Sequence, residues 1–281
     1  MTTRKPQGRR PQGRRPSAVG ATAAAGVQAP RHGVARVLSK HGLCSRTEAA
    51  AWVREGRVQV DGRVVRDPEF PVVAGRQVVS VDGQALDAPH RHYLMLNKPR
   101  GLVTTARDEQ GRDTVYSCLR ETGLPWLAPV GRLDKASEGL LLFSNDPQWA
   151  AGITDAQGGV LKTYHVQIDA VPDPALLQQL QAGARVDEAV LRAVSVRLLR
   201  SGQRNSWIEV VLDEGRNRHI RRLLEAFDIG VLRLVRVAIG ALHLGALPKG
   251  QWRLLEAGEL SALAQPPVAP ASAPGAWPAD G

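Results

Sequence analysis

The sequence has few cysteines and no long apolar run. Its two cysteines, Cys44 and Cys118, cannot form the several disulfides that hold small secreted domains together, so a reducing cytosolic setting is the simplest interpretation. No stretch approaches the roughly 18 apolar residues of a membrane-spanning helix, and the N-terminus has no apolar signal-peptide segment. We therefore expect a cytoplasmic protein with no membrane association.

The sequence also lacks the common motifs for metals and phosphates. Its seven histidines are scattered, and the closest pair, His90 and His92, falls in an expected linker or at the start of a strand. No glycine-rich phosphate-binding loop is present. We therefore expect no cofactor and no metal. A metal-dependent nucleic-acid hydrolase is disfavoured because it would need clustered acidic side chains.

What the sequence does contain is an uneven excess of positive charge. The formal net charge is +10, and residues 1–30 carry six cations and no acid, so subtracting these six leaves +4 for the rest. The repeat PQGRRPQGRRP and the Ala/Gly stretch after it predict a disordered basic tail over 1–30, and Pro/Ala-rich residues 264–281 predict a second one. The basic tail would either add phosphate contacts or only aid solubility.

Residues 32–80 predict a small unit of two helices and a hairpin. Apolar residues at helical spacing indicate the first helix, and Ser45 with Glu48 forms a capping box that begins the second. Gly56 is expected to end that helix. Asp61-Gly62 lies between two alternating segments, which is a strong hairpin signal.

Basic side chains of this unit could line one face, although pattern alone leaves an ordinary solvated surface equally open. The segment GLCSRTEAAAWVREGRVQVDG resembles the RNA-binding domain typified by ribosomal protein S-four. In that domain, basic residues of the second helix and of the turn before it meet structured RNA. The resemblance implies RNA contacts for Arg36, Lys40, Arg46, Arg54 and Arg57.

The segment GRLDKASEGLLLFSND, residues 131–146, places the carboxylate of Asp134 between a tight turn and a buried-strand pattern. A buried carboxylate is costly unless cations or hydrogen-bond donors compensate it, so such a residue is either paired structurally or held for chemistry. Spacing alone favours the structural alternative, in which Asp134 caps a turn and pairs with Arg132 or Lys135.

Two later segments carry further candidates. Residues 162–168 alternate as a strand that includes Tyr164, and a tyrosine in such a strand most often serves packing. The segment EGRNRHIRRLLEAFD predicts an amphipathic helix with Arg218, Arg221 and Arg222 in its first turn. Cations at a helix N-terminus oppose the helix dipole, so phosphates or a buried carboxylate should offset their cost. Other predicted elements are strands over 92–97, 195–199, 207–212 and 231–244 and a helix over 173–182.

In chain order, NKPRG, GRLD, the Lys-x-Tyr strand, GRNRHIRR and GALPKGQWRLL closely resemble the motifs of the RsuA-type family of ribosomal RNA pseudouridine synthases. The resemblance covers residues 32 to about 263. It implies an α+β catalytic domain over 91–263, built on a mixed, mainly antiparallel sheet with flanking helices and preceded by the RNA-binding domain over 32–80. We expect a monomer.

The resemblance also implies the reaction. The bond from the ribose to the uracil nitrogen breaks, the base rotates, and it rejoins the ribose through carbon 5, with no cofactor. Asp134 is the essential residue and either attacks the sugar or base covalently or takes a ribose proton, which the sequence leaves open. Arg221 pairs with Asp134 and keeps it charged, and Tyr164 assists removal of the carbon 5 proton.

The same resemblance makes Arg132 a phosphate contact beside a flipped-out uridine, with Arg218 and Arg222 as further RNA contacts. The chain departs from the family at His219, where glutamine is usual. Lys135 after the aspartate favours large-subunit ribosomal RNA over small-subunit or transfer RNA. The remaining alternative, a non-catalytic RNA-binding or ribosome-assembly protein, predicts the loss of Asp134, Tyr164 or Arg221, yet all three are present.

Overall fold

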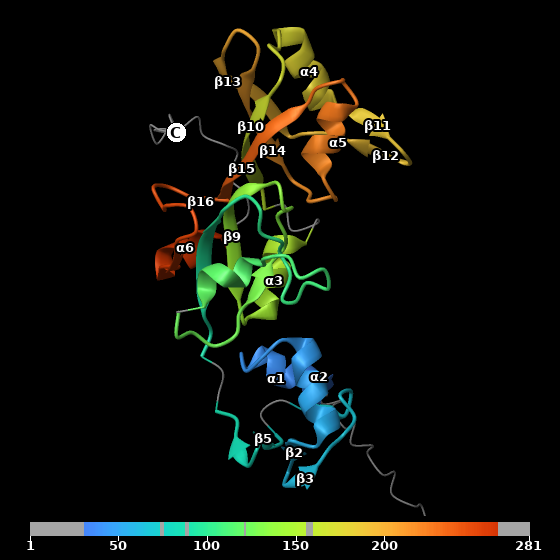
Figure 1. Cartoon of the computed structure of the whole chain (residues 1–281), viewed down its shortest axis with the longest axis vertical. Helices are drawn as coiled ribbons and strands as arrows, with labels where there is room; N and C mark the ends of the chain where they lie inside the picture. The colour runs from blue at the N-terminus through green and yellow to red at the C-terminus, as the bar shows by residue number, and fades with distance from the viewer. Residues whose placement is uncertain (1–30, 74–75, 88–89, 121, 156–159, 264–281) are drawn as a thin grey trace, which may run out of the picture.

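The computed structural model describes residues 31–73, 76–87, 90–120, 122–155 and 160–263. In Figure 1 the molecule is elongated, with a small N-terminal unit at one end and a larger β-sheet unit over the rest. Both predicted tails, 1–30 and 264–281, lie outside the described residues. Within the described part of the chain, no helix is long and apolar enough to cross a membrane.

The N-terminal unit has the predicted two helices and hairpin. Ser45 begins the second helix, its hydroxyl accepting a hydrogen bond from the Glu48 amide at 3.2 Å, and Gly56 ends it in the left-handed region at φ 80°. Asp61 and Gly62 both have positive φ, as a two-residue hairpin turn requires. The elements are β1 (Arg31–Gly33), α1 (Val34–Lys40), α2 (Arg46–Glu55), β2 (Val58–Val60), β3 (Arg63–Val64), β4 (Pro71–Val73), β5 (Val79–Val81) and β6 (Gln84–Ala85).

A single core cluster holds this unit together. Fully buried Val34, Leu38, Val53 and Val58 bring both helices onto one face of the small sheet β3-β2-β5-β6. The last strand of that sheet ends at Ala85, beyond residue 80, where the sequence placed the end of the unit.

The larger unit is built on a mixed sheet in the order β13-β14-β10-β15-β9-β7-β17. Strands β9 and β15 run parallel and the other neighbouring pairs run antiparallel, which confirms the predicted sheet type. The strands are β7 (Tyr93–Lys98), β8 (Ala128–Val130), β9 (Glu138–Ser144), β10 (Lys162–Ile168), β11 (Ala184–Val186), β12 (Ala189–Leu191), β13 (Ser195–Ser201), β14 (Ser206–Leu212), β15 (Val231–Ile239), β16 (Leu242–His243) and β17 (Trp252–Leu254). The helices are η1 (Val115–Leu119), α3 (Pro147–Thr154), α4 (Pro174–Ala182), α5 (His219–Glu225) and α6 (Ala257–Leu263).

Strand β9 is the centre of this unit, and all seven of its residues are buried. Its pairing with β15 involves only Glu138 with Val235 and Gly139 with Arg236, so the two halves of the sheet meet at a short junction. Gly139 has φ 101°, and a Cβ at this position would overlap the backbone oxygen of Arg236. The second residue of β9 must therefore be glycine for the halves to meet this closely.

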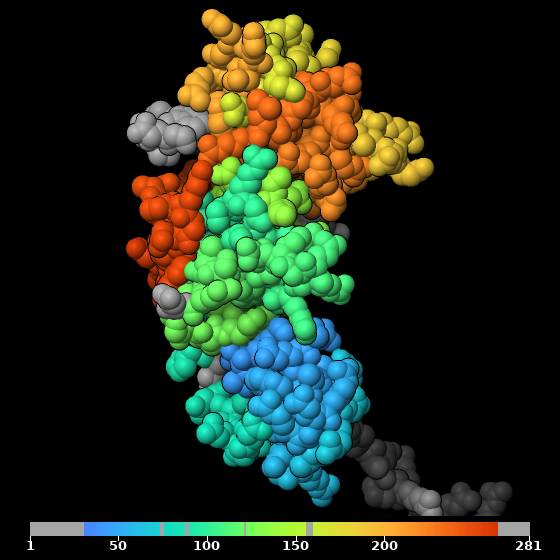
Figure 2. Space-filling model, in the orientation of Figure 1, coloured from blue at the N-terminus to red at the C-terminus, as the bar shows by residue number. Residues whose placement is uncertain are grey.

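The N-terminal unit packs against the larger unit, as Figure 2 shows for its blue and green segments. The amide of Trp126 donates to the carbonyl of Gly42 at 2.7 Å. Gly42 lies in the turn after α1 at φ 76°, and a Cβ there would come within 3.3 Å of the Asn145 side chain. The end of β9 therefore lies against the turn that joins the two N-terminal helices.

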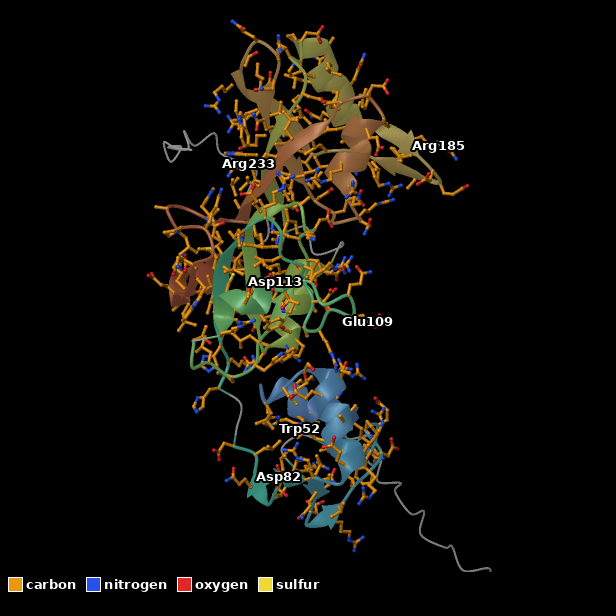
Figure 3. The ribbon with its side chains drawn as sticks, in the orientation of Figure 1. Trp52, Asp82, Glu109, Asp113, Arg185 and Arg233 are labelled. Carbon is orange, nitrogen blue, oxygen red and sulfur yellow. The ribbon has the colours of Figure 1, made fainter. Side chains whose placement is uncertain are left out.

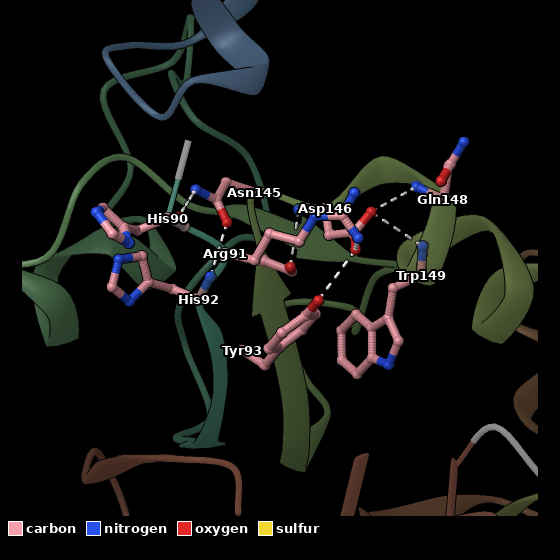
Figure 4. Close-up of polar contacts among 9 residues, drawn as sticks. His90, Arg91, His92, Tyr93, Asn145, Asp146, Gln148 and Trp149 are labelled. Carbon is pink, nitrogen blue, oxygen red and sulfur yellow. Dashed lines mark hydrogen bonds and ion pairs between the residues drawn. The ribbon is translucent and has the colours of Figure 1, made fainter. Parts of the chain in front are cut away.

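Hydrogen bonds to Asn145 and Asp146 hold the chain that enters the larger unit (Figure 4). Asn145 accepts from the His92 amide at 2.9 Å and donates to the His90 carbonyl at 2.8 Å. Asp146 accepts from Arg91 at 2.6 Å and from the Tyr93 hydroxyl at 3.0 Å, and it also caps α3. Residues 90 and 91, at the end of the linker predicted around residues 85–91, are thus fastened to the two residues that follow β9.

Candidate active site

A cavity of about 320 Å³ opens at the junction of the two halves of the sheet. The GRLD loop, β10, β15 and the segment that leads into α5 all contribute to its wall. Asp134 is the single carboxylate among the residues that line it. Six cationic side chains line it as well: Arg132, Lys162, Arg216, Arg218, Arg221 and Arg236.

A lysine that sequence reasoning did not single out is hydrogen-bonded to the loop that carries Asp134. Lys98 ends β7 and is fully buried, and its ammonium group donates to the carbonyls of Pro99, Asp134 and Ser137 at 3.1, 3.2 and 2.8 Å. Burial lowers the pKa of Lys98 to about 8. The signal in the sequence was a lysine at the end of an apolar strand, immediately before a proline.

The Asp134 side chain is half-buried and lines the cavity. Among the described residues it forms no ion pair with Arg132 or Lys135, which was the structural alternative. The predicted pair with Arg221 is not formed either. The Arg221 guanidinium instead donates to the carbonyls of Ala136 at 3.2 Å and Val231 at 3.4 Å. A carboxylate without a structural partner is thus exposed to the cavity.

Arg221 nevertheless responds to the charge of Asp134. Burial is the main reason that the pKa of Arg221 lies below its usual value, and the nearby Arg218 adds to this shift while the Asp134 carboxylate opposes it. The Nε atom of Arg221 is buried and has no hydrogen-bond partner among the described residues. The guanidinium therefore lies near the carboxylate and keeps donor capacity that the protein does not use.

The position of Tyr164 is compatible with both roles named from the sequence, packing in the sheet and assistance in the reaction. Its half-buried ring packs against the cores on both sides of the sheet junction, and it also lines the cavity. In the register of the sheet it lies between Val210 of β14 and Arg236 of β15.

The helix that follows EGRN is shorter than its sequence pattern predicts. It begins at His219 because Arg218 adopts the left-handed conformation at φ 50°, and it ends at Glu225. Exposed Arg218 lines the cavity. Arg222 instead pairs with Asp187 at 2.6 Å. Of these two arginines, Arg218 therefore lines the cavity and Arg222 does not.

His219 occupies the position where the resembling family has glutamine. Its Nε2 atom lies 3.0 Å from the Arg192 carbonyl, and its Nδ1 atom lies 3.6 Å from a carboxylate oxygen of Glu214. Burial lowers the pKa of His219. The ring thus connects the start of α5 to the segment after β12 by a hydrogen bond that a glutamine side chain is also able to make.

Comparisons with known proteins identify the family. Residues 92–226 match the RNA pseudouridylate synthase family, and residues 34–78 match the S4 domain. An uncharacterized RNA pseudouridine synthase of Aquifex aeolicus (strain VF5) is 34% identical over 230 residues, which are 81% of this chain and 92% of the relative. The chain belongs to the RNA pseudouridine synthase family.

Other relatives are consistent with this assignment. The ribosomal large subunit pseudouridine synthase B of Bacillus subtilis (strain 168) is 32% identical over 231 residues, covering 81% of this chain and 93% of the relative. A crystal structure of a pseudouridylate synthase aligns with a TM-score of 0.56 over 83% of this chain and 99% of its own, at 24% identity, and so shows the fold. The predicted fold class, family and S4-type domain are confirmed.

Sequence reasoning about the synthase singled out none of three cations that line the cavity, Lys162, Arg216 and Arg236. Arg216 is exposed, whereas Lys162 and Arg236 are buried, at 9% and 5% exposure. Lys162 lies two residues before Tyr164 on β10, and alternation along a strand would have placed both on one face. Arg236 could not be found this way, because only the pairing of β15 with β10 brings it opposite Tyr164.

A second, more open hollow of about 460 Å³ adjoins the cavity of the synthase. Arg132 and Asp134 line both spaces. The rest of its wall comes mainly from the loop after β7, which includes Arg107 and Arg112. Figure 3 labels Glu109 and Asp113 of this loop, with Glu109 at the right edge of the larger unit. Arg132 is thus the exposed cation where the two spaces meet.

The basic residues of the S4 domain are only partly free. Arg57 pairs with Asp82 at 2.7 Å and lies 4.7 Å from the centre of the Trp52 ring, both labelled in Figure 3. Arg46 pairs with Glu69 at 3.3 Å, and Lys40 lies 3.2 Å from a ring nitrogen of His32. Arg36 and Arg54 have exposed side chains. None of the five predicted contacts, Arg36, Lys40, Arg46, Arg54 and Arg57, lines the cavity.

The described part of the synthase contains no cluster of three or more histidine, cysteine or acidic side chains that could hold a metal ion. The cations of the cavity are instead all arginine or lysine side chains.

Proposed function

We propose that this synthase converts uridine to pseudouridine in large-subunit ribosomal RNA, with Asp134 as the residue that acts on the target nucleotide. The carrying observation is a lone, unpaired carboxylate in a cavity lined by six cations. A carboxylate that served only the fold would be expected to be paired by one of them. The relative from Bacillus subtilis, named as a large-subunit synthase, supports the choice of RNA.

The cavity is suited to one nucleotide. Its volume of about 320 Å³ lies at the lower end of the range for small-molecule sites, and a base paired within a duplex could not enter it. The target uridine must therefore leave its stack before it reaches Asp134, which costs a few kcal/mol. The surrounding arginines offset that cost by contacting phosphates, and exposed Arg132 and Arg218 are the best placed to do so.

Asp134 then reacts as a carboxylate. It either forms a bond to the sugar or base, or takes a proton from the ribose, and both routes require the ionised form. The positively charged guanidinium of Arg221 lies near this carboxylate and is hydrogen-bonded to the Ala136 carbonyl rather than to Asp134 itself.

Tyr164 lines the same cavity and supplies a flat ring for the base to stack on, with a hydroxyl group that can assist removal of the carbon 5 proton directly or through water. The S4 domain adds RNA contacts outside the cavity. Of the five predicted contacts, exposed Arg36 and Arg54 have no ion-pair partner among the described residues, and Lys40, Arg46 and Arg57 would have to exchange their present partners for phosphates. Arg222 would likewise have to leave Asp187.

The test is to map pseudouridine by carbodiimide modification and primer extension on ribosomal RNA from cells with and without the gene. We expect one large-subunit site to disappear, and to return with the wild-type gene but not with Asp134→Asn. Asp228→Asn is the matched control, because it removes an exposed carboxylate remote from the cavity at φ 55°, a conformation that asparagine tolerates.

The outcomes separate the alternatives. A missing site in small-subunit RNA would correct the substrate while leaving the reaction in place. No missing site in either subunit would redirect the search to transfer RNA or to the non-catalytic alternative. Restoration by Asp134→Asn would refute the role of that residue. To exclude a folding defect, both variants should unfold at the wild-type temperature, since aspartate and asparagine have nearly the same volume.

A further inference from the structure

More cations line the cavity than have a partner among the described acids and carbonyl groups. Arg216 pairs with Glu214 at 2.8 Å, and Arg221 is hydrogen-bonded to two carbonyls. Arg132 and Arg218 are exposed and form no ion pair among the described residues, so they are available for phosphates. Lys162 and Arg236 remain, and both are buried cations without an ion-pair partner among the described residues.

Burying a cation without a counter-charge is costly, so its position needs a reason. Arg236 is fixed by a hydrogen bond from Nε to the Leu140 carbonyl at 2.7 Å, while its Nη2 atom is buried and has no partner among the described residues. Burial is the main reason that the pKa of Lys162 lies below its usual value; the nearby Arg236 adds to this shift and the Asp213 carboxylate opposes it. Two like charges therefore belong to the wall of one cavity, with no ion pair between either of them and an acid of the described residues.

The sheet places these cations beside the tyrosine. Arg236 is the partner of Tyr164 in the pairing of β15 with β10, immediately after a register shift between Thr163 and Tyr164. Lys162 lies two residues before Tyr164 on the same strand, and all three side chains line the cavity. On the other side of Arg236 is Gly139, the second residue of the strand that follows the Asp134 loop. A base stacked on Tyr164 would thus have both cations at its edge.

We propose that Lys162 and Arg236 bind the ring carbonyl oxygens of the target uracil and stabilise the negative charge that the base carries after its bond to the ribose has broken. This inference rests on the proposed function, because it assigns residues to a step of that reaction. When the bond from the ribose to the uracil nitrogen breaks, its electron pair stays with the base, which becomes an anion. That charge is shared between the nitrogens and the two carbonyl oxygens.

The electron balance of the remaining steps is simple. The anion rotates and carbon 5 gives an electron pair to the ribose carbon that lost the nitrogen. Carbon 5 then loses its proton to the Tyr164 hydroxyl or to water, and the ring nitrogen released from the ribose takes up a proton, so the product is a neutral isomer of the substrate. No oxidant, reductant or group donor is needed. Fixed, buried donors are most effective for such a developing charge because they need no reorganisation when it appears. Two unpaired cations suit an anion that exists only during the reaction.

The test uses the full-length protein and a ribosomal RNA fragment that contains the mapped uridine. In single-turnover reactions we expect Lys162→Met and Arg236→Met to slow conversion of bound RNA by about 100-fold, the size seen when one donor to a developing anion is removed. The Kd for RNA, from fluorescence anisotropy, should change by less than about threefold, because the anion is absent from the bound ground state. Lys162→Arg and Arg236→Lys should recover part of the rate.

A substituted substrate provides a readout that a merely structural role would not move. RNA with 2-thiouridine or 4-thiouridine at the target has a weaker hydrogen-bond acceptor at one carbonyl position. Wild type should be slowed by at least one of these substitutions, and the corresponding methionine variant should show no further slowing, because the contact is already gone. Arg253→Met is the control variant, since Arg253 pairs with Glu259 at 2.6 Å away from the cavity; it should respond to thio-substitution as wild type does.

Several results would overturn the inference. They are a wild-type rate for both methionine variants, a loss of RNA affinity that equals the loss of rate, or thio effects as large in the variants as in wild type. If the methionine variants fail to fold, equal wild-type rates on the uridine and both thiouridine RNAs would overturn it instead. An inactive wild type would refute the proposed function, a separate outcome.

Discussion

Gly139 should be the position where one added methyl group does the most damage. It lies where β9 meets β15, at φ 101°, and a Cβ there would approach the backbone nitrogen and carbonyl carbon of Arg236 to 2.8 and 3.0 Å and its oxygen more closely still. The obstacle is backbone on a neighbouring strand, which cannot move aside as a flexible side chain would. Relief requires the two strands to separate at a junction of only two residue pairs.

The cost of Gly139→Ala has two parts. An L-residue held at strongly positive φ loses about 1–2 kcal/mol, and forcing a methyl group into a packed site costs about 1–3 kcal/mol more. The free energy of unfolding should therefore fall by about 3 kcal/mol, which lowers the Tm by roughly 6–12 °C for a domain of this size. Because the junction carries both the Asp134 loop and Arg236, the single-turnover rate should fall more than the affinity for RNA.

The matched control is Gly152→Ala in α3, where a Cβ meets nothing within 4 Å and alanine favours the helix. It should leave the rate unchanged and raise the free energy of unfolding by up to about 1 kcal/mol. Urea unfolding at pH 7, followed by tryptophan fluorescence with the m-value checked for constancy, measures both variants. An unchanged midpoint for Gly139→Ala would refute the argument that β9 and β15 cannot separate.

Two other predictions test the support of the site and of the outer sheet. Lys98→Met should reduce the single-turnover rate by about 100-fold, because it removes the hydrogen bonds that hold the Asp134 loop. The urea midpoint should change little, since removing a buried charge offsets much of the cost of the lost hydrogen bonds. Full activity of this variant would contradict the role of Lys98. Hydrogen bonds from His165 and then Arg197 lower the pKa of Glu209 to about 2. Since its folded pKa lies below its unfolded value, Glu209 should stabilise the fold above about pH 4.5 and lose this effect between pH 4.5 and 2. Glu209→Gln should thus be less stable than wild type at pH 7 and equally stable near pH 2, and a gap in urea midpoint that persists at low pH would count against it.

Local signals in the sequence predicted local structure well. Ser45 and Gly56 marked the ends of α2 because a cap depends on residues only a few positions apart. The alternation over residues 162–168 coincided with β10 for the same reason, since its two faces differ in burial along one short segment. The Asp134 loop was also recognisable, because its turn and its buried strand are adjacent in the chain.

What the sequence could not predict depends on pairing between distant segments. Nothing near Arg236 indicates that it lies opposite Tyr164, because 72 residues separate them and only the register of β15 with β10 brings them together. The acceptor of Arg221 was wrong for a related reason. The pattern showed a cation and a carboxylate that would attract each other, but the Ala136 carbonyl lies closer to the guanidinium once the loop is folded. Lys98 was missed because lysine is rarely fully buried.

The contact between Gly42 and Trp126, together with the anchoring of residues 90–93 on Asn145 and Asp146, has a consequence for how a target is selected. If the S4 domain were joined only by a flexible tether, it would raise the local concentration of RNA around the cavity and little more. Docked as it is, it holds its cations at a set distance and direction from Asp134. Under the proposed function, an RNA would have to present a phosphate surface and an extruded uridine with matching separation, and the docked domain would then select targets by their three-dimensional shape.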